Sequence, residues 1–190
     1  RQVTQGLFEL SINIVDNDCS ESARSTVEAL ARQSNVSISY HVEPRQNIAL
    51  ARNMAIEHAK GDFYAFIDDD ELPSSQWLLS LYKAIDRHGA DGILGPVLPR
   101  FEKEPPKWVV RGRFFDRPSC ISGQILEWQN TRTGNALLKA ALFKDKNAWF
   151  RPEFGSGGED RDFFRRKIGE GRTFIWCNEA SVFENVPPEA

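Results

Sequence analysis

Strand-like and helix-like segments alternate along the first half of the chain, and this alternation constrains the fold more than any other feature. From Leu7 to Val15, apolar residues recur at every second position, the period of a strand with one buried face. Ser20 to Gln33 has helical spacing, and Ser20 is suited to cap its start. Val36 to Val42 alternates again, and Ile48 to Lys60 is an alanine-rich stretch that ends at a glycine.

The same order is repeated once more before residue 99. Asp62 to Ile67 is a short apolar run, Ser74 to His88 is an amphipathic segment followed by Gly89, and Ala90 to Leu98 is apolar again. Strands that alternate with helices form a mainly parallel sheet covered by helices on its faces. We therefore predict an α/β fold with a doubly wound, mainly parallel sheet and flanking helices.

Beyond residue 98 the composition changes. Residues 99–134 combine prolines, aromatic residues and many Arg and Lys without a clear period, which indicates a loop-rich insertion with a function. The patterns after it predict strands and helices in the order Gly134–Leu138, Ala140–Lys146, Glu159–Gly169, Arg172–Cys177 and Ala180–Phe183. At 190 residues the chain has the size of one domain. We divide it into halves 1–98 and 99–190.

Charge and cysteine content exclude several classes of protein. A net charge of −3 without any basic block argues against a nucleic-acid partner. Cys19, Cys120 and Cys177 are widely spaced, so neither a zinc site nor a disulfide framework is expected, and a reducing cytoplasm is the simplest compartment. The chain has no run of about 18 apolar residues. Any membrane contact would therefore be peripheral, at the inner face of the membrane, or carried by sequence outside these residues.

The most informative residues are acidic. Asp68, Asp69, Asp70 and Glu71 directly follow the strand that ends at Ile67, and Asp16 follows the first strand. Four adjacent carboxylates repel one another unless a cation lies among them. Because ligands bind at the carboxyl ends of parallel strands, we expect both acidic strand ends at one rim of the sheet. The alternative is an ordinary solvated helix start.

A second acidic pair follows a glycine-rich loop. Glu159 and Asp160 come after Gly155-Ser-Gly-Gly158 and open a helix. Such a pair is either an ordinary cap that interacts with the helix dipole or a general base presented by the loop.

Four motifs in this order resemble family-2 glycosyltransferases of the GT-A fold. They are Asn47-Ile-Ala-Leu-Ala-Arg-Asn53, Gly61-Asp-Phe-Tyr-Ala-Phe-Ile-Asp-Asp-Asp-Glu71 with Pro73, Thr133-Gly-Asn135 and Gly157-Gly-Glu-Asp-Arg-Asp-Phe163. The resemblance covers residues 7 to 187 and is greatest to bacterial enzymes of exopolysaccharide synthesis, of the succinoglycan type. The last two motifs are similar to the family's acceptor-side motifs.

The resemblance implies roles on the donor side. Asp16 resembles the carboxylate that binds the nucleotide base, typically uracil. Asp68 and Asp69 would face the ribose, the sugar or metal-bound waters, and Asp70 would hold Mn²⁺ or Mg²⁺. Donor contacts are also expected from Arg45, Asn47 and Arg52, although Arg52 could equally form a structural pair on its own helix.

On the acceptor side, Asp160 resembles the catalytic base and Glu159 its neighbour. Glu184 stands where many relatives carry a metal-binding His, and a carboxylate could replace that ligand. The family also has a strand before the segment that matches Leu7, in the middle of the sheet. Nothing before Leu7 matches it, so we expect that first strand to be missing.

The implied function is an inverting transfer of a hexose from a nucleotide-sugar, a UDP-sugar, to the hydroxyl of a saccharide or lipid-linked saccharide. Residues 1–98 would bind the donor and residues 99–190 the acceptor. Two alternatives use similar acids: a metal-dependent phosphohydrolase or nucleotidyltransferase, and a non-catalytic receiver-like module. For the first alternative, this sequence lacks a glycine-rich phosphate loop, and Leu72 stands where the nucleophile motif of such enzymes has Thr or Val. The second does not need the loop before Glu159.

Overall fold

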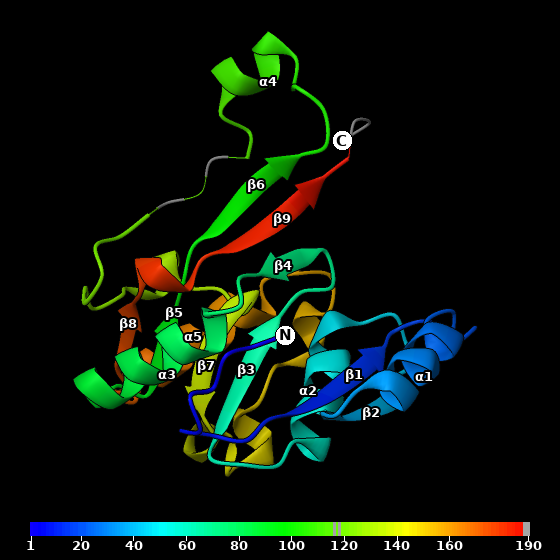
Figure 1. Ribbon diagram of the computed structural model, residues 1–190. Helices are drawn as coiled ribbons and strands as arrows, with labels where there is room; N and C mark the ends of the chain where they lie inside the picture. The colour runs from blue at the N-terminus through cyan, green and yellow to red at the C-terminus, as the bar shows by residue number, and fades with distance from the viewer. Residues whose placement is uncertain (116, 118, 188–190) are drawn as a thin grey trace. The chain divides into compact units, whose positions relative to one another are not determined.

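The computed structural model describes residues 1–115, 117 and 119–187, which form an α/β structure (Figure 1). The helices are α1 Arg24–Gln33, α2 Ile48–His58, α3 Trp77–His88, α4 Lys107–Gly112 and α5 Glu159–Gly169. The strands are β1 Ser11–Asp16, β2 Ser37–Val42, β3 Phe63–Ile67, β4 Glu71–Pro73, β5 Gly92–Leu94, β6 Val97–Phe101, β7 Asn135–Lys139, β8 Phe174–Trp176 and β9 Val182–Val186. In these described residues, no helix is long and apolar enough to cross a membrane.

The chain divides into two compact units, which are described separately. Unit 1 contains Arg1–Gln5, Ala65–Leu138 and Gly171–Ala190, and unit 2 contains Gly6–Tyr64 and Lys139–Glu170. Each unit takes segments from both of the halves that the sequence suggested. The assignment of donor and acceptor to residues 1–98 and 99–190 stays a prediction, as does the missing first strand.

Unit 2 is built on the parallel pair β1–β2, in which Asp16 lies opposite Val42. Helix α2 packs against β1, and α1 packs against β2. The core beneath α5 is aromatic: Phe163 stacks on Phe143 with ring centroids 5.2 Å apart and contacts Phe150 at 4.8 Å. These rings are almost completely buried, so they fix α5 within this unit.

Unit 1 contains two sheets. The four-stranded sheet has the order β3-β7-β5-β8, with β5 antiparallel to β7 and parallel to β8. The three-stranded sheet has the order β4-β9-β6, with β9 antiparallel to β4 and parallel to β6. Leu81 of α3 is fully buried, as are Ile93 and Leu94 of β5. The expected α/β class is confirmed, with mixed sheets.

Asn135 holds the centre of unit 1 together. Its side chain is fully buried, accepts a hydrogen bond from Trp77 Nε1 (2.8 Å), and donates to the carbonyls of Pro96 (3.0 Å) and Ala180 (2.7 Å). A buried amide with all these bonds is a structural element, because each lost bond would leave a buried polar group without a partner. Asn135, which belongs to the motif Thr133-Gly-Asn135 that resembles an acceptor-side motif, therefore lies in the core.

Several predicted boundaries are wrong for local reasons. Helix α1 begins at Arg24 without a side-chain cap, because the Ser20 hydroxyl donates to Asp18 (2.5 Å) and Glu21 has a φ of +57°. Helix α2 ends at His58, and Ala59 is already extended, so Gly61 is not its cap.

The strand predicted from Ala90 to Leu98 is interrupted and forms β5 and β6. At the interruption Pro96 has no N–H to donate to a sheet. A side chain at Gly95 would come within 2.3 Å of the Ala180 carbonyl oxygen. Gly89, in contrast, closes α3 in the left-handed conformation as predicted, with φ +62°.

Candidate functional site

The acidic run after β3 folds into a tight turn that separates its four carboxylates by burial. Asp68, Asp69 and Asp70 are exposed, whereas Glu71 is 7% exposed. The Glu71 N–H donates to the Asp68 carbonyl (3.2 Å), and the Asp68 N–H donates to Glu71 Oε2 (3.3 Å). The turn therefore presents three carboxylates to solvent and folds the fourth beneath them.

The environment of Glu71 favours its protonated form. Burial is the largest cause and, with the negative charge of Asp68, raises the pKa of Glu71 to about 8. Removal of a carboxylate from water penalises its charged form, and a neighbouring negative charge adds to that penalty. The four acids therefore do not carry four full charges at neutral pH in the absence of a cation.

Gly134 and β9 hold this turn in unit 1. A side chain on Gly134 would lie 2.8 Å from both Asp68 Oδ2 and Glu71 Oε1, so glycine leaves room for the two carboxylates where they lie, and a larger residue would displace them. From the other strand, the Asn185 N–H donates to the Asp70 carbonyl (3.1 Å). The sequence did not predict β4, which pairs with β9 and produces this arrangement.

Glu184 lies on β9 beside the turn. Its Cα is in register with that of Glu71, and its carboxylate forms an ion pair with Arg117. The next residue, Asn185, contacts Asp70 through its backbone N–H. The ligand role of Glu184 stays a prediction, because its side chain has a cationic partner here.

The donor atoms of the turn suit a hard divalent cation. Carboxylate oxygens are the ligands of Mg²⁺ and Mn²⁺, and Mg²⁺ commonly takes one or two carboxylates and completes its shell with substrate phosphates and water. Within the described ranges, no three His, Cys, Asp or Glu side chains are grouped so that they could hold a metal ion. Asp68, Asp69 and Asp70 have the donor atoms that such a cation prefers, but as placed they do not form a three-residue site.

Asp16 is the last residue of β1 and is 8% exposed. Its carboxylate accepts hydrogen bonds from the Tyr40 hydroxyl (2.6 Å) and from the N–H groups of Ala23 (3.0 Å) and Asp18 (3.1 Å). The bond from Tyr40 contributes most to lowering the pKa of Asp16. This carboxylate is thus charged and fixed in place, with little of it open to solvent.

Asp16 and the acidic turn belong to different sheets. Strand β1 is part of the two-stranded sheet of unit 2, whereas β3 is part of the four-stranded sheet. The prediction that both acidic strand ends lie at the rim of one sheet is therefore wrong. Two segments with the same strand-like pattern of apolar residues need not be hydrogen-bonded into the same sheet.

The loop after β2 carries Arg45 and Asn47. Arg45 is mostly exposed and forms two hydrogen bonds to the buried Glu43 carboxylate, from Nε (2.9 Å) and from Nη2 (3.2 Å). Asn47 caps α2 by accepting from the Leu50 N–H (3.1 Å) and donates to the Pro152 carbonyl (2.9 Å). The amide of Asn47 is thus engaged within unit 2, whereas the Arg45 guanidinium remains accessible.

Asn17 organises this loop, and sequence reasoning missed it. Its side-chain amide donates to the carbonyls of Glu43 (2.7 Å) and Arg45 (2.6 Å), and its oxygen accepts from the Asn47 N–H (3.0 Å). Its position directly after Asp16 was the available signal, because polar residues at strand ends often bind neighbouring loops. Tyr40 was missed as well, since a tyrosine in a strand is ordinarily a packing residue.

Arg52 and Glu159 form a buried ion pair. Their side chains are 12% and 2% exposed, and one guanidinium nitrogen binds Glu159 Oε1. The other oxygen, Oε2, is buried and has no hydrogen-bond partner among the described residues. The structure therefore pairs Arg52 with a different helix, rather than its own, and places Glu159 in the interior.

Asp160 is the neighbouring residue and is partly exposed. It follows Gly157 and Gly158, whose φ values of +127° and +92° are strained for other residues. Its Oδ1 accepts from the Arg161 N–H (2.7 Å). The glycines thus set the direction from which the chain enters α5 and fix the start of the helix at this acidic pair.

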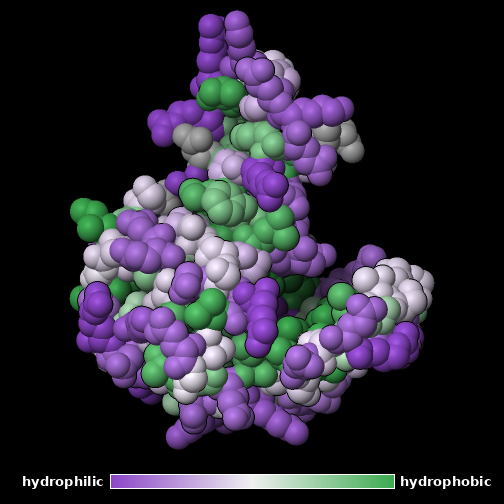
Figure 2. Space-filling view, viewed as in Figure 1, coloured by the Kyte–Doolittle hydropathy of each residue, from purple (hydrophilic) through white to green (hydrophobic). Residues whose placement is uncertain are grey.

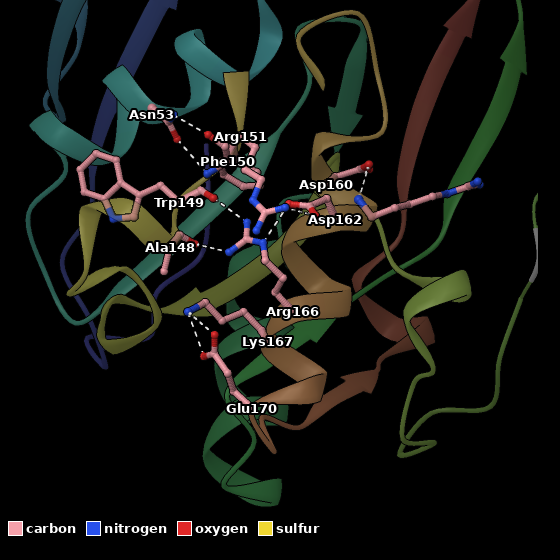
Figure 3. A network of polar contacts seen from close by, with 11 residues as sticks. Asn53, Ala148, Trp149, Phe150, Arg151, Asp160, Asp162, Arg166, Lys167 and Glu170 are labelled. Atoms are coloured by element: carbon pink, nitrogen blue, oxygen red, sulfur yellow. Dashed lines mark hydrogen bonds and ion pairs between the residues drawn. The ribbon is translucent and has the colours of Figure 1, made fainter. Parts of the chain in front are cut away.

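A polar network attaches α5 to residues 148–151 (Figure 3). Arg166 binds Asp162 Oδ2 (2.8 Å) and donates to the carbonyls of Ala148 (2.8 Å) and Trp149 (2.6 Å). Asn53 of α2 bonds to the backbone of Phe150 at both its N–H (3.1 Å) and its carbonyl (2.8 Å). Asp160 therefore stands at the end of a helix that is fixed by several bonds.

The comparisons with known proteins agree with the motifs. Residues 3–152 match the family model described as Glycosyl transferase family 2. Succinoglycan biosynthesis protein ExoM of Rhizobium meliloti (strain 1021) is 38% identical over 183 residues, which cover 94% of this chain and 57% of that protein. The chain thus spans little more than half of this relative.

Solved structures show the same fold. The crystal structure of S. aureus TarS 1-349 in complex with UDP-GlcNAc superposes with a TM-score of 0.70 at 19% identity, over 94% of this chain and 50% of that chain. The complex of TarS 1-349 with UDP gives 0.68 at 20% identity, over 95% and 52%. At this identity the likeness establishes the fold, and the expected GT-A fold is confirmed.

Proposed function

The chain belongs to glycosyl transferase family 2, and on this premise we propose that it is an inverting glycosyltransferase that moves a hexose from a UDP-sugar to an acceptor hydroxyl. The observation that carries the proposal is the family match over residues 3–152, which includes the turn of exposed carboxylates after β3. Membership in this family argues against a phosphohydrolase and against a receiver-like binding module.

On the donor side, the proposed roles belong mainly to acidic residues. Asp16 accepts a hydrogen bond from the uracil base, and Tyr40 keeps its carboxylate charged and oriented. Asp68 and Asp69 contact the ribose and sugar, and Asp70 holds Mn²⁺ or Mg²⁺, with Glu184 as a second ligand once it leaves Arg117. When bound, this cation would supply positive charge that stabilises the diphosphate of the departing UDP.

Donor contacts from the loop after β2 fall mainly to Arg45. Its exposed guanidinium is held by Glu43 at one edge, and the Arg45 backbone is bonded to Asn17, the residue that follows Asp16. The side chains of Asn47 and Arg52 keep α2 attached to the segments that follow it. We assign both of them a supporting role in donor binding.

On the acceptor side, Asp160 takes the proton from the attacking hydroxyl. Its partial exposure and its place at the start of α5 support this role. Glu159 is buried and paired with Arg52, so we assign it a positioning role that fixes Asp160. A positioned carboxylate base typically contributes about 10²–10⁴-fold to the rate.

ExoM is described as a succinoglycan biosynthesis protein, and this supports a saccharide or lipid-linked saccharide as the acceptor in polysaccharide or glycoconjugate synthesis. Action in the cytoplasm, at the inner face of the membrane, belongs to the same proposal. The free thiols of Cys19, Cys120 and Cys177 are compatible with that compartment.

The decisive experiment is a screen of UDP-sugars for hydrolysis and transfer, with and without Mn²⁺, against generic phosphate esters. We expect turnover of one UDP-sugar that depends on Mn²⁺ and rises when a suitable saccharide is added. The Asp160→Asn variant should retain donor binding and lose transfer. Turnover of phosphate esters without any reaction of UDP-sugars would refute the proposal.

A further inference from the structure

The segment that follows β6, residues 102–115, forms a projecting hairpin, which we call the α4 hairpin (Figure 1). It is anchored in unit 1 by two inward side chains. The ring of Phe115 packs edge-on against Phe101 of β6, with centroids 5.4 Å apart, and Val109 is 6% exposed. Pro106 precedes the helix and fixes its entry.

Three apolar side chains of the α4 hairpin point to solvent instead. Trp108 is 65% exposed, Val110 61% and Phe114 67%. Single exposed apolar residues are normal on protein surfaces, but several that lie together indicate an interaction site. These three fall within seven residues, and Trp108 contacts Phe114 directly, with ring centroids 5.8 Å apart.

Cations are interleaved with these apolar residues. Lys103, Lys107, Arg111 and Arg113 are all exposed, and they outnumber the two exposed acids of this segment, Glu102 and Glu104, so the segment carries a net charge of +2 (four cations minus two acids). Lys107 and Arg111 are four positions apart, so they lie on one side of α4, away from the buried Val109. Figure 2 shows hydrophilic and hydrophobic atoms interleaved over this hairpin.

We propose that the α4 hairpin docks on an anionic lipid bilayer. Basic side chains near an anionic membrane surface are attracted to it, and Trp and Phe insert into the headgroup region. The rings of Trp108 and Phe114 meet at an interplanar angle of 73°, so together they form a compact apolar projection. Val110 adds an exposed aliphatic side chain to it, and aliphatic groups favour the apolar part of a bilayer.

The docking surface is separate from the proposed catalytic residues. None of its residues is assigned to the donor, the metal or the base. Docking would keep the enzyme near a lipid-linked acceptor, but the binding itself does not depend on the transferase reaction. A failure of docking would remove the membrane contact from the proposed function but leave the transferase chemistry standing, and a failure of the chemistry would leave docking standing.

The test is co-sedimentation of the 190-residue chain with vesicles of phosphatidylcholine alone or mixed with phosphatidylglycerol. We expect the wild type to bind the mixed vesicles more tightly, and increasingly so at low salt. The Lys107→Gln/Arg111→Gln variant should lose about 30-fold in partitioning to mixed vesicles, since each cation near the surface contributes roughly fivefold. Trp108→Ala should lose about 10-fold with both compositions.

Matched variants lie outside the α4 hairpin. Ile121 is 77% exposed, so Ile121→Ala controls for the loss of an exposed apolar side chain. Lys60→Gln/Lys144→Gln removes two exposed cations from unit 2. Both control variants should bind vesicles like the wild type, and all variants should keep the wild-type melting temperature.

Three outcomes would overturn the proposal. The first is that the hairpin variants and the control variants weaken vesicle binding equally. The second is that the wild type shows no preference for anionic vesicles. The third is a dimer in solution that Trp108→Ala abolishes, without vesicle binding, which would assign this surface to a second copy of the chain.

Discussion

Glu71 and Glu184 lie directly opposite each other in the antiparallel pair β4–β9, but their surroundings differ. Glu184 forms an ion pair with Arg117, whereas burial raises the pKa of Glu71 to about 8. Directly opposed residues of an antiparallel pair share one face. One strand register thus brings a charged and a mainly neutral carboxyl group beside the candidate metal turn.

Glu71 should make stability depend on pH. Its pKa rises on folding from 4.5 to about 8, so the native state binds the proton more tightly than the unfolded state. The resulting stabilisation is complete below about pH 4.5 and is lost as the pH rises to about 8. In EDTA at pH 8.5, the free energy of unfolding of Glu71→Gln should therefore exceed that of the wild type by on the order of 1 kcal/mol, measured by denaturant unfolding. If the difference in free energy of unfolding between Glu71→Gln and the wild type is the same at pH 5 and pH 8.5, the prediction is contradicted.

Asp70→Asn should abolish Mn²⁺-dependent UDP binding, measured by calorimetry, without lowering the melting temperature. Asp70 is exposed, so its loss removes a ligand without disturbing the core. Asp86→Asn, which changes an exposed acid on α3, is the matched control and should bind UDP normally. Wild-type UDP affinity in Asp70→Asn would remove this residue from the metal site.

Glu184 should contribute to metal affinity once it is released from Arg117. Glu184→Ala should weaken Mn²⁺ binding more than Glu184→His, because the imidazole can still act as a ligand. Arg117→Met should strengthen it, since the competing ion pair is lost. Titration of Mn²⁺ by electron paramagnetic resonance gives the Mn²⁺ affinity of each variant. Equal affinities in all three variants would assign Glu184 a structural role only.

Asp160→Asn should lower transfer by at least about 10²-fold, as expected for the loss of a general base, while Kd for UDP-sugar stays near the wild-type value. The control is Glu153→Gln, which removes an exposed carboxylate from the same unit. Near-normal transfer in Asp160→Asn would place the base elsewhere, with Glu159 as the next residue to change.

The pair Arg52–Glu159 should be worth far more to stability than an exposed pair. Removal of one partner of a buried ion pair costs about 3–5 kcal/mol, so Arg52→Met and Glu159→Gln should each be strongly destabilising in urea. Arg52→Met/Glu159→Leu should regain much of that loss, because no charge is left buried. Glu57→Gln breaks the exposed pair with Lys146 and should leave the urea midpoint close to the wild-type value, because exposed ion pairs contribute little to stability. Similar losses for both pairs would contradict the buried role.

The sequence by itself determined the class of the fold, the family and the order of most elements. Hydrophobic period depends on neighbours along the chain, so it located β2, α3 and α5 well. The four motifs were recognisable because each is continuous in sequence. Gly89 and the start of α5 at Glu159 were predictable for the same reason, since caps and turns are local chemistry.

Only the tertiary structure decided what each side chain contacts. It paired Arg52 with Glu159 across 107 positions, buried Glu71 against Asp68 beneath Gly134, and gave Glu184 a partner in Arg117. It also created β4, whose three residues have no pattern of their own and are ordered by β9. Burial and long-range pairing depend on segments that are distant in the chain, so a run of four acids specifies a charge but not which carboxylate stays charged.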